Sequence, residues 1–438
     1  MNITIVTLFV GNIMKNFKIR KGLVLGIILL FIGASITHSI GGIYIERSIF
    51  QNIKSNSKLA RSRGYIQNLI DNASDGDTIY VPNGTYYENI IINKSINLVG
   101  ENKLNTIIDG SKFGDVIYVS ADGVTISGFT IQNSGWYKDY YDGIDVRSNY
   151  NNITDNIFNC NTHGIKLDNS DGNTIYDNRF ISHFYSEIWV HYSKNNTIVG
   201  NDLFSIQNND SVYKRAMCIS YSNNNTILGN TIFSKTKQSG YCSCIDIDRN
   251  SDGNSILENK IILEFSYGIR LWTVSNNLII GNTIISNNNS IGIDLRSSDG
   301  NILSRNFISH TWCSIDIDYS NNNTINDNNL ISNYRGISSY RSNNVSIVHN
   351  NIILNEEFGI TLASSNGNII EKNNFQNNKI NAVFLNCTNT WRKNYWNRPR
   401  LFPKLIFGVK TIKTDLGIDI PIPLLDFDNR PALKPYDI

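Results

Sequence analysis

Ten asparagines recur along the middle of this 438-residue chain at nearly constant intervals. Successive intervals are 22, 23, 29, 29, 23, 24, 22, 22 and 23 residues. Ile or Leu lies three positions before each asparagine, and an apolar residue lies two positions after it. The ten residues are Asn156, Asn178, Asn201, Asn230, Asn259, Asn282, Asn306, Asn328, Asn350 and Asn373. A fixed period of this length predicts an array of stacked supersecondary units.

Each period contains two or three short runs of alternating apolar and polar residues, separated by clusters of Asn, Ser, Asp and Gly. In the run from Gly164 to Asp168, Ile165 and Leu167 point to one face of a strand while Lys166 and Asp168 point to the other. The turn clusters use residues that tolerate left-handed backbone geometry. No segment has the spacing of an amphipathic helix, which excludes helical solenoids. The sequence therefore predicts an all-β fold, a single-stranded right-handed parallel β-helix of about thirteen coils with about 22 residues each.

The recurrent asparagines are expected to form a ladder inside one bend, with each side-chain amide bonded to the next. The Asn-rich composition explains their abundance but not their constant phase. The region between Asn83 and Arg398 contains no proline, as continuous hydrogen-bonded ladders require.

The two ends of the chain differ from the repeats. Residues 60–73 place Ile66, Leu69, Ile70 and Ala73 at helical spacing, which predicts a short helix covering the first coil. Six of the seven prolines lie between Pro399 and Pro435, which indicates a non-repetitive tail. We expect a signal peptide or signal anchor at 1–44, a cap with the short helix at 45–75, the β-helix at 76–398, and a C-terminal tail at 399–438.

The first residues have the pattern of an export signal. Four basic residues between Lys15 and Lys21 precede an apolar run from Gly22 to Ile36. The run is short for a transmembrane helix, and no clean cleavage site follows it. We expect a secreted or cell-surface protein, anchored to the membrane if the signal is retained, with Met14 as an alternative start. The net charge of +2 argues against a nucleic-acid partner, and we expect a monomer.

Six cysteines in an exported chain permit disulfides. Cys218 and the pair Cys242 and Cys244 fall on adjacent coils, so one bridge between them is an expectation. Cys-x-Cys alone is weak support for a metal site.

Aligning the coils on the most regular strand gives two columns of outward side chains. The first column contains Asp145, Lys166, Trp189, Cys218, Asp246, Arg270, Asp294, Asp316, Ser338 and Thr361. The second contains Arg147, Asp168, His191, Ser220, Asp248, Trp272, Arg296, Asp318 and Tyr340. A solvated face whose opposite charges form cross-strand pairs would account for much of this pattern.

Two details go beyond such charge pairing. Trp189 and Trp272 are predicted to be exposed aromatics on a charged face, and exposed aromatics often bind ligands. Asp294, Asp316 and Asp318 lie close together without an equal number of cations, so they could raise one another's pKa or hold Ca²⁺. We expect no other cofactor.

Extra residues enter three coils just before the same strand, at Ser134–Tyr141, around Asn208–Arg215 and at Ser234–Tyr241. Loops stacked on one edge would form a wall beside the face. Their aromatic and basic residues suit a polysaccharide, especially an acidic one, although loops without a ligand are the alternative. The substrate-binding candidates are Trp189, Trp272, Asp248, Arg296, Asp318, Tyr340, Trp136, Tyr137, Tyr140, Lys214 and Arg215.

Several segments resemble the pectate-lyase-like right-handed β-helix proteins, and within them the NosD-type surface and periplasmic proteins with carbohydrate-binding repeats. They are Gly76–Tyr86, Ser95–Gly100, Thr106–Gly110, Val124–Ile131 and the closing Asn394–Trp396. The resemblance covers residues 64–398 and is specific for the fold, whereas such proteins share coils rather than active sites.

The resemblance implies three activities. A polysaccharide lyase or epimerase needs a base and a group that neutralises a carboxylate, for which the candidates are Arg270, Arg296, Lys166 and His191. A glycoside hydrolase needs two carboxyl groups, for which the candidates are Asp246, Asp248, Asp294, Asp316 and Asp318. The NosD name implies copper delivery, but six histidines and three methionines are scattered, whereas soft copper sites concentrate such donors. We expect a β-helix that binds, and could modify, polysaccharide; a structural or adhesive envelope protein is the rival.

Overall fold

The computed structural model describes most of the chain beyond residue 59. The described residues are 60–61, 64–135, 141–206, 214–235, 242–287, 289–413 and 419–438. The predicted signal segment and the loop candidates Trp136, Tyr137 and Tyr140 lie outside these ranges. Among the described residues, no helix is long and apolar enough to cross a membrane.

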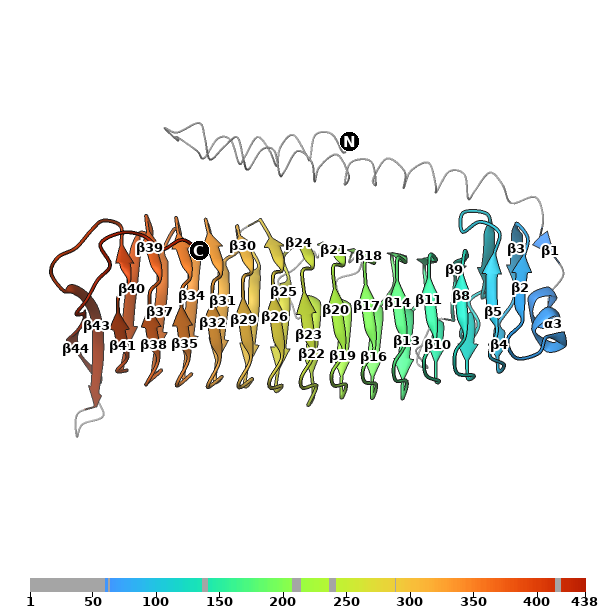
Figure 1. The fold of residues 1–438 in the computed structure, drawn as a ribbon, viewed down its shortest axis with the longest axis horizontal. Coiled ribbons are helices and arrows are strands. Elements are labelled where there is room, and N and C mark those ends of the chain that lie inside the picture. Colours follow the sequence, from blue (N-terminus) through green and yellow to red (C-terminus); the bar gives the residue numbers. More distant parts are fainter. Residues whose placement is uncertain are drawn as a thin grey trace, which may run out of the picture. The chain divides into compact units, whose positions relative to one another are not determined.

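Three parallel sheets run along the coils, because successive coils contribute one strand to each sheet (Figure 1). Sheet A consists of β1 (Ala60–Arg61), β3 (Gly84–Tyr87), β6 (Thr106–Asp109), β9 (Thr130–Gln132), β12 (Ile157–Asn159), β15 (Arg179–Ile181), β18 (Asp202–Ile206), β21 (Thr231–Lys235), β24 (Lys260–Glu264), β27 (Thr283–Ile285), β30 (Phe307–Ser309), β33 (Asn329–Ile331), β36 (Asn351–Ile353), β39 (Asn374–Gln376) and β42 (Tyr395–Trp396). Sheet B consists of β2 (Thr78–Val81), β5 (Asn97–Gly100), β8 (Thr125–Ser127), β11 (Asn152–Thr154), β14 (Thr174–Tyr176), β17 (Thr197–Val199), β20 (Thr226–Leu228), β23 (Ser255–Leu257), β26 (Leu278–Ile280), β29 (Ile302–Ser304), β32 (Thr324–Asn326), β35 (Ser346–Val348), β38 (Ile369–Glu371) and β41 (Thr390–Arg392).

Sheet C carries the candidate site. It consists of β4 (Ile90–Ile92), β7 (Ile117–Val119), β10 (Asp142–Val146), β13 (His163–Asp168), β16 (Ser186–His191), β19 (Arg215–Ser220), β22 (Ser243–Asp248), β25 (Tyr267–Trp272), β28 (Ile291–Arg296), β31 (Cys313–Asp318), β34 (Arg335–Tyr340), β37 (Phe358–Ala363), β40 (Ile380–Leu385), β43 (Lys404–Lys413) and β44 (Asp419–Asp428). The fourteen strands of sheet B correspond to fourteen coils, one more than the expected thirteen. The predicted parallel β-helix is confirmed.

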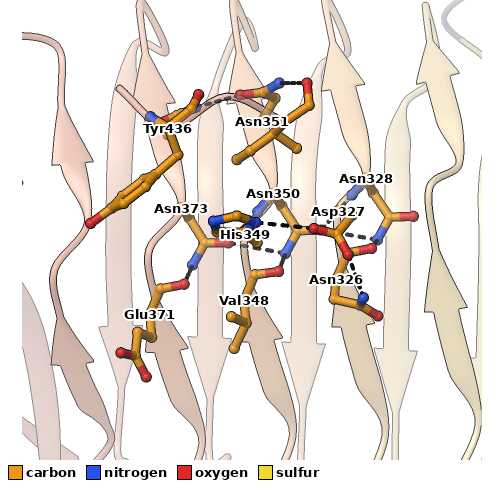
Figure 2. A network of polar contacts seen from close by, with 12 residues as sticks. Asn326, Asp327, Asn328, Val348, His349, Asn350, Asn351, Glu371, Asn373 and Tyr436 are labelled. Atoms are coloured by element: carbon orange, nitrogen blue, oxygen red, sulfur yellow. Dashed lines mark hydrogen bonds and ion pairs between the residues drawn. The ribbon is translucent and has the colours of Figure 1, made fainter. Parts of the chain in front are cut away.

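The recurrent asparagines are buried at the bend between sheets B and A. Asn350 donates from Nδ2 to Oδ1 of Asn373 at 3.0 Å, and its own Oδ1 accepts the Nδ2 of Asn328 at 2.9 Å. Figure 2 shows these three side chains in line across successive coils. Nδ2 of Asn350 also donates to the carbonyl of Val348, two residues earlier. Since the intervening His349 has a φ of 61°, the left-handed residue and the asparagine amide together make the bend.

The core consists of stacked aliphatic side chains that point inward from all three sheets. Ile144, Ile165 and Ile188 are fully buried and lie on adjacent sheet C strands in register. The same position recurs in each coil, so one apolar column runs through the fold. Phe158 and Phe180 add a stacked aromatic pair with a centroid distance of 4.8 Å.

Both ends of the coil stack are covered. Helix α3 (Tyr65–Asn72) packs Ile66 and Ile70 into the core, and Glu88 accepts the backbone N–H groups of Ile66 and Gln67. At the other end, β43 pairs with β40, and β44 pairs with β43 in antiparallel orientation (Figure 1). The short helix expected at residues 60–73 is therefore present over a narrower range.

The expected disulfide is not formed, because all six cysteines are free. In the register of sheet C, Cys218 lies opposite Asp246, not opposite Cys242 or Cys244. Cys244 is fully buried and directly precedes the inward Ile245. The alignment of the coils placed these cysteines on adjacent coils correctly, but their side chains occupy different positions across the strand.

Candidate functional site

The outward side of sheet C from β10 to β37 is referred to as the charged face. The register places successive members of each predicted outward column on neighbouring strands. In the first column, Asp246 is followed by Arg270, Asp294 and Asp316. In the second column, Trp272 is followed by Arg296, Asp318 and Tyr340. Asp294 and Asp316 are therefore direct neighbours, as the alignment of the coils predicted.

Sheet C also presents a third outward column that the sequence interpretation missed. Its members along the register are Asp142, His163, Ser186, Arg215, Ser243, Tyr267, Ile291, Cys313, Arg335 and Phe358. A simple alternation misses it because one additional residue, glycine in six of the ten strands, separates each member from the inward apolar residue. A Cβ at Gly292 would lie 2.5 Å from the carbonyl oxygen of Ser314, so the backbones approach closely there. The recurring Gly-Ile pair was the signal that could have revealed this column.

At β10, three carboxyl groups converge. Oxygens of Asp115, Asp142 and Asp145 all lie within 4.8 Å of one another. Burial raises the pKa of Asp115 to about 7 and raises the pKa of Asp142 well above its ordinary value. Nδ1 of His163 lies 2.6 Å from Oδ1 of Asp142, and burial lowers the pKa of His163 to about 3. The group is therefore held partly protonated, beside a neutral imidazole.

Next to this group, one aspartate gathers three basic side chains. Asp168 lies 2.7 Å from Arg147 and 3.2 Å from Lys166, and Oδ1 of Asp168 lies 3.2 Å from Nδ1 of His191. The charges of Lys166 and Arg147 lower the pKa of Asp168 although its burial acts to raise it.

In the middle of the face, Asp246 lies between two arginines. Arg270 forms a bidentate pair with it, at 2.9 and 2.7 Å, and Nε of Arg215 lies 2.7 Å from Oδ2 of Asp246. Asp246 is completely buried and Arg270 nearly so. Such a bidentate pair fixes both side chains and leaves neither free to meet a ligand.

Towards β31, a single arginine forms ion pairs with three carboxylates. Arg296 lies 2.9 Å from Asp294, 3.8 Å from Asp316 and 3.2 Å from Asp318. Burial raises the pKa of Asp294 to about 6, against the opposing effect of Arg296. Within the described residues, the three-carboxyl group at β10 is the one set of His, Cys, Asp or Glu donors close enough to share a metal ion. Arg296 therefore lies against the three aspartates that were predicted to raise one another's pKa or to hold Ca²⁺, and calcium binding there stays a prediction.

The aromatic candidates differ in how far they reach solvent. The side chains of Trp272 and Tyr340 are 44% and 39% exposed, and Arg270 lies 5.3 Å from the Trp272 ring. Trp189 is only half-exposed, because Lys166 lies over its ring and Nε1 donates to Oγ of Ser220. Both tryptophans point outward, as predicted.

Along the bend after sheet C, further rings gather at left-handed positions. Tyr192 and Tyr221 stack at a centroid distance of 4.8 Å, and both have φ near 50°. Tyr319 lies beside Tyr340, and Arg341 lies 5.3 and 5.1 Å from these two rings. The sequence interpretation missed Tyr192, Tyr221, Tyr319 and Arg341, because left-handed residues break the strand alternation on which the columns were built.

The predicted site residues fall into two groups. Trp272 and Tyr340 are exposed, and six further candidates are partly exposed: Arg296, Asp318, Trp189, Lys166, His191 and Asp316. By contrast, the candidates Asp246, Asp248, Asp294 and Arg270 are buried on the face.

Lys214 was predicted to bind substrate from the loop wall, and the structure corrects this prediction. It is buried, lies 3.1 Å from the fully buried Glu187, and donates to the carbonyl of His183. Because Glu187 points into the fold, Lys214 turns inward to neutralise it. Its neighbour Arg215 is the first residue of β19 and does not belong to a loop. The Arg215 side chain forms an ion pair with Asp246.

Comparison with known proteins identifies a family. Residues 70–250 and 244–410 match the family described as periplasmic copper-binding protein (NosD). A comparison with curated protein sequences gives no significant match. Solved β-helix structures are similar at low identity. PfbA, a surface adhesin of Streptococcus pneumoniae, has a TM-score of 0.39 at 14% identity, with 84% of this chain and 96% of that chain covered. A mannuronic acid specific family 6 polysaccharide lyase from human gut microbiota has a TM-score of 0.48 at 14% identity, with 76% and 84% covered.

In the described residues, the side chains that copper prefers as ligands do not cluster into a metal site. Five of the six histidines and all six cysteines are described, and none of them belongs to a group of three close His, Cys, Asp or Glu donors. His163, His191 and His349 each lie against an aspartate, and Cys218, Cys244 and Cys313 are buried. Copper sites need concentrated thiolate, thioether or imidazole ligands. The side chains of the described residues therefore do not form the donor set that the family description implies for copper.

Proposed function

The chain belongs to the NosD family, and we propose that it acts in the cell envelope or outside the cell by binding polysaccharide on the charged face. The family description places its members in the periplasm, and the predicted export signal agrees with that location. Membrane anchoring through residues 1–44 is part of the same proposal.

The observation that carries the proposal is the second outward column between β25 and β34. Exposed rings at Trp272 and Tyr340 flank the polar side chains of Arg296 and Asp318 on consecutive strands. Aromatic faces stack on the C–H side of sugar rings, while carboxylate and guanidinium groups bond the hydroxyls. A regular spacing of about 4.8 Å between strands suits a repeating polymer.

Binding is favoured over catalysis at this face. The buried Asp246 and Asp294 are tied to arginines, so neither carboxyl group is placed to reach a sugar. A catalytic acid or base must come within hydrogen-bond distance of its substrate. We therefore propose a glycan-binding protein and assign no reaction.

The test is binding of the purified full-length chain to a panel of polysaccharides by isothermal titration calorimetry. We expect Trp272→Ala and Tyr340→Ala each to weaken binding about tenfold, because each removes one stacking platform. Tyr80→Ala is the matched control, since Tyr80 is a 73% exposed aromatic residue on sheet B. Absence of binding to every neutral and acidic glycan would leave a structural or adhesive envelope protein as the remaining interpretation.

A further inference from the structure

The charges of the charged face are paired with one another. Its three columns contain six cations, Arg147, Lys166, Arg215, Arg270, Arg296 and Arg335. They contain eight carboxyl groups, Asp142, Asp145, Asp168, Asp246, Asp248, Asp294, Asp316 and Asp318. Every one of the six cations lies within 4.0 Å of a carboxylate. The face thus offers no row of unpaired cations along the coils.

This pairing disfavours a polyanionic ligand. A uronate or sulfate group would have to displace an aspartate from Arg296, or Glu357 from Arg335 at 2.6 Å. The displaced carboxylate would then remain beside the incoming negative charge. Like charges brought together at a partly desolvated surface oppose binding and exclude the wrong partner.

Within the described residues, the neighbouring bend from β10 to β37 adds the cations Lys194, Arg249 and Arg341 and the carboxylates Asp171, Asp252 and Asp299. Arg249 lies 3.9 Å from Asp248, which already neutralises it. Arg341 donates to the hydroxyl of Tyr319 at 2.7 Å and lies over aromatic rings, so it holds those rings in place. Lys194 and Arg341 therefore do not outweigh the carboxyl groups of the charged face and the bend together.

We propose that the charged face takes an uncharged, hydroxyl-rich glycan chain and discriminates against acidic polysaccharides. This inference rests on the proposed function and names its ligand class. Asp318 is partly exposed although its Oδ1 is buried, so its accessible acceptor is Oδ2, which accepts one hydrogen bond from Arg296 and keeps a further lone pair for a sugar hydroxyl. Trp272 and Tyr340 lie three strands apart, about 14 Å, so the ligand is an oligosaccharide that reaches both rings.

The test compares neutral and acidic polymers on the same full-length protein. Xylan, mannan and a β-glucan are the neutral probes, and alginate, polygalacturonate and heparin are the acidic probes, each at low and at physiological salt. We expect a neutral probe to bind with little dependence on salt, and the acidic probes to bind at least about tenfold more weakly.

A charge variant tests the reason for the preference. Asp316→Asn combined with Asp318→Asn leaves Arg296 with Asp294 alone, so we expect the variant to gain salt-sensitive binding of alginate. Both aspartates are partly exposed, so the fold should persist, and circular dichroism checks this. The matched control is Asp299→Asn, an aspartate outside the three columns.

The outcomes are distinguishable. Tight binding of acidic probes by the native chain, without binding of neutral ones, would overturn this inference and leave the proposed glycan binding intact. Failure of both classes to bind would overturn the proposed function itself. An unchanged preference in the double variant would show that charge pairing does not select the ligand.

Discussion

Individual side chains on the charged face are shaped by opposing effects of burial and charge. Asp294 is completely buried, yet it lies 2.9 Å from Arg296 and next to Asp316. Burial outweighs the arginine, so the pKa of this carboxyl group is about 6 rather than 3.8. A position that looks like an ordinary surface charge in the sequence therefore binds its proton at a higher pH than a solvent-exposed aspartate, because it is buried.

Asp294 should make stability depend on pH in a defined direction. Because its folded-state pKa lies above the unfolded value of 3.8, the folded protein holds the extra proton between about pH 4 and pH 6. The contribution of this group to the free energy of unfolding should therefore fall as pH rises through that window, by at most about 3 kcal/mol, and stay level above it. Denaturant titrations of the native chain and of Asp294→Asn, which cannot titrate, measure the difference. Parallel curves for the two proteins from pH 4 to pH 7 would contradict the assignment.

At the scale of elements, the coils at the two ends of the stack need hydrogen-bond partners from outside the repeats. In the middle of the stack, the neighbouring coils supply these partners. Each asparagine of the ladder donates its backbone N–H and its Nδ2 to Oδ1 of the asparagine in the next coil, as Asn373 does to Asn394, and Asn394 itself has no further coil to donate to. Asp428 on β44 replaces that coil. Its carboxylate accepts the backbone N–H groups of Lys393 and Asn394, Nδ2 of Asn394 and Nε1 of Trp396.

Removal of this carboxylate should loosen the end of the ladder. Asp428→Ala leaves several buried donors without partners, so we expect the free energy of unfolding to fall by about 3 kcal/mol or more. Hydrogen exchange should become faster at residues 390–397 first, while β10 to β28 keep their protection. Asp426→Ala is the control, because Asp426 lies on the same strand and accepts the exposed backbone N–H of its neighbour Phe427. Equal effects of the two substitutions would argue against a capping role.

At the scale of the whole β-helix, each coil contacts mainly the coils before and after it. Strands Ile302–Ser304, Thr324–Asn326 and Ser346–Val348 pair successively in the same register. Stability in such an array is approximately a sum of coil and neighbour contributions. Any complete coil between the two caps is therefore exchangeable in principle.

Deletion of one complete coil should leave the fold intact. Removing Thr324–Val345 brings Ser346 into the register of Thr324, so β35 can pair with β29 and the asparagine ladder continues. We expect a folded protein with an unchanged β-sheet circular dichroism spectrum and a cooperative thermal transition. Deletion of residues 324–334, about half a coil, shifts inward residues onto the wrong face and should prevent folding. A misfolded full-coil deletion would contradict the independence of the coils.

The sequence alone determined the period of the coils, the parallel β-helix and the identity of two outward columns. Repetition at a fixed phase constrains which residues become neighbours, so the spacing of the coils was enough to place Asp294 and Asp316 side by side. Only the tertiary structure showed which ion pairs the side chains at those positions form. Arg296 turns toward three aspartates, Lys214 turns inward to Glu187, and Arg215 and Arg335 join the face in a third column. The direction and burial of a side chain depend on its contacts with the neighbouring coils. The repeat period and the composition of the sequence do not specify these contacts.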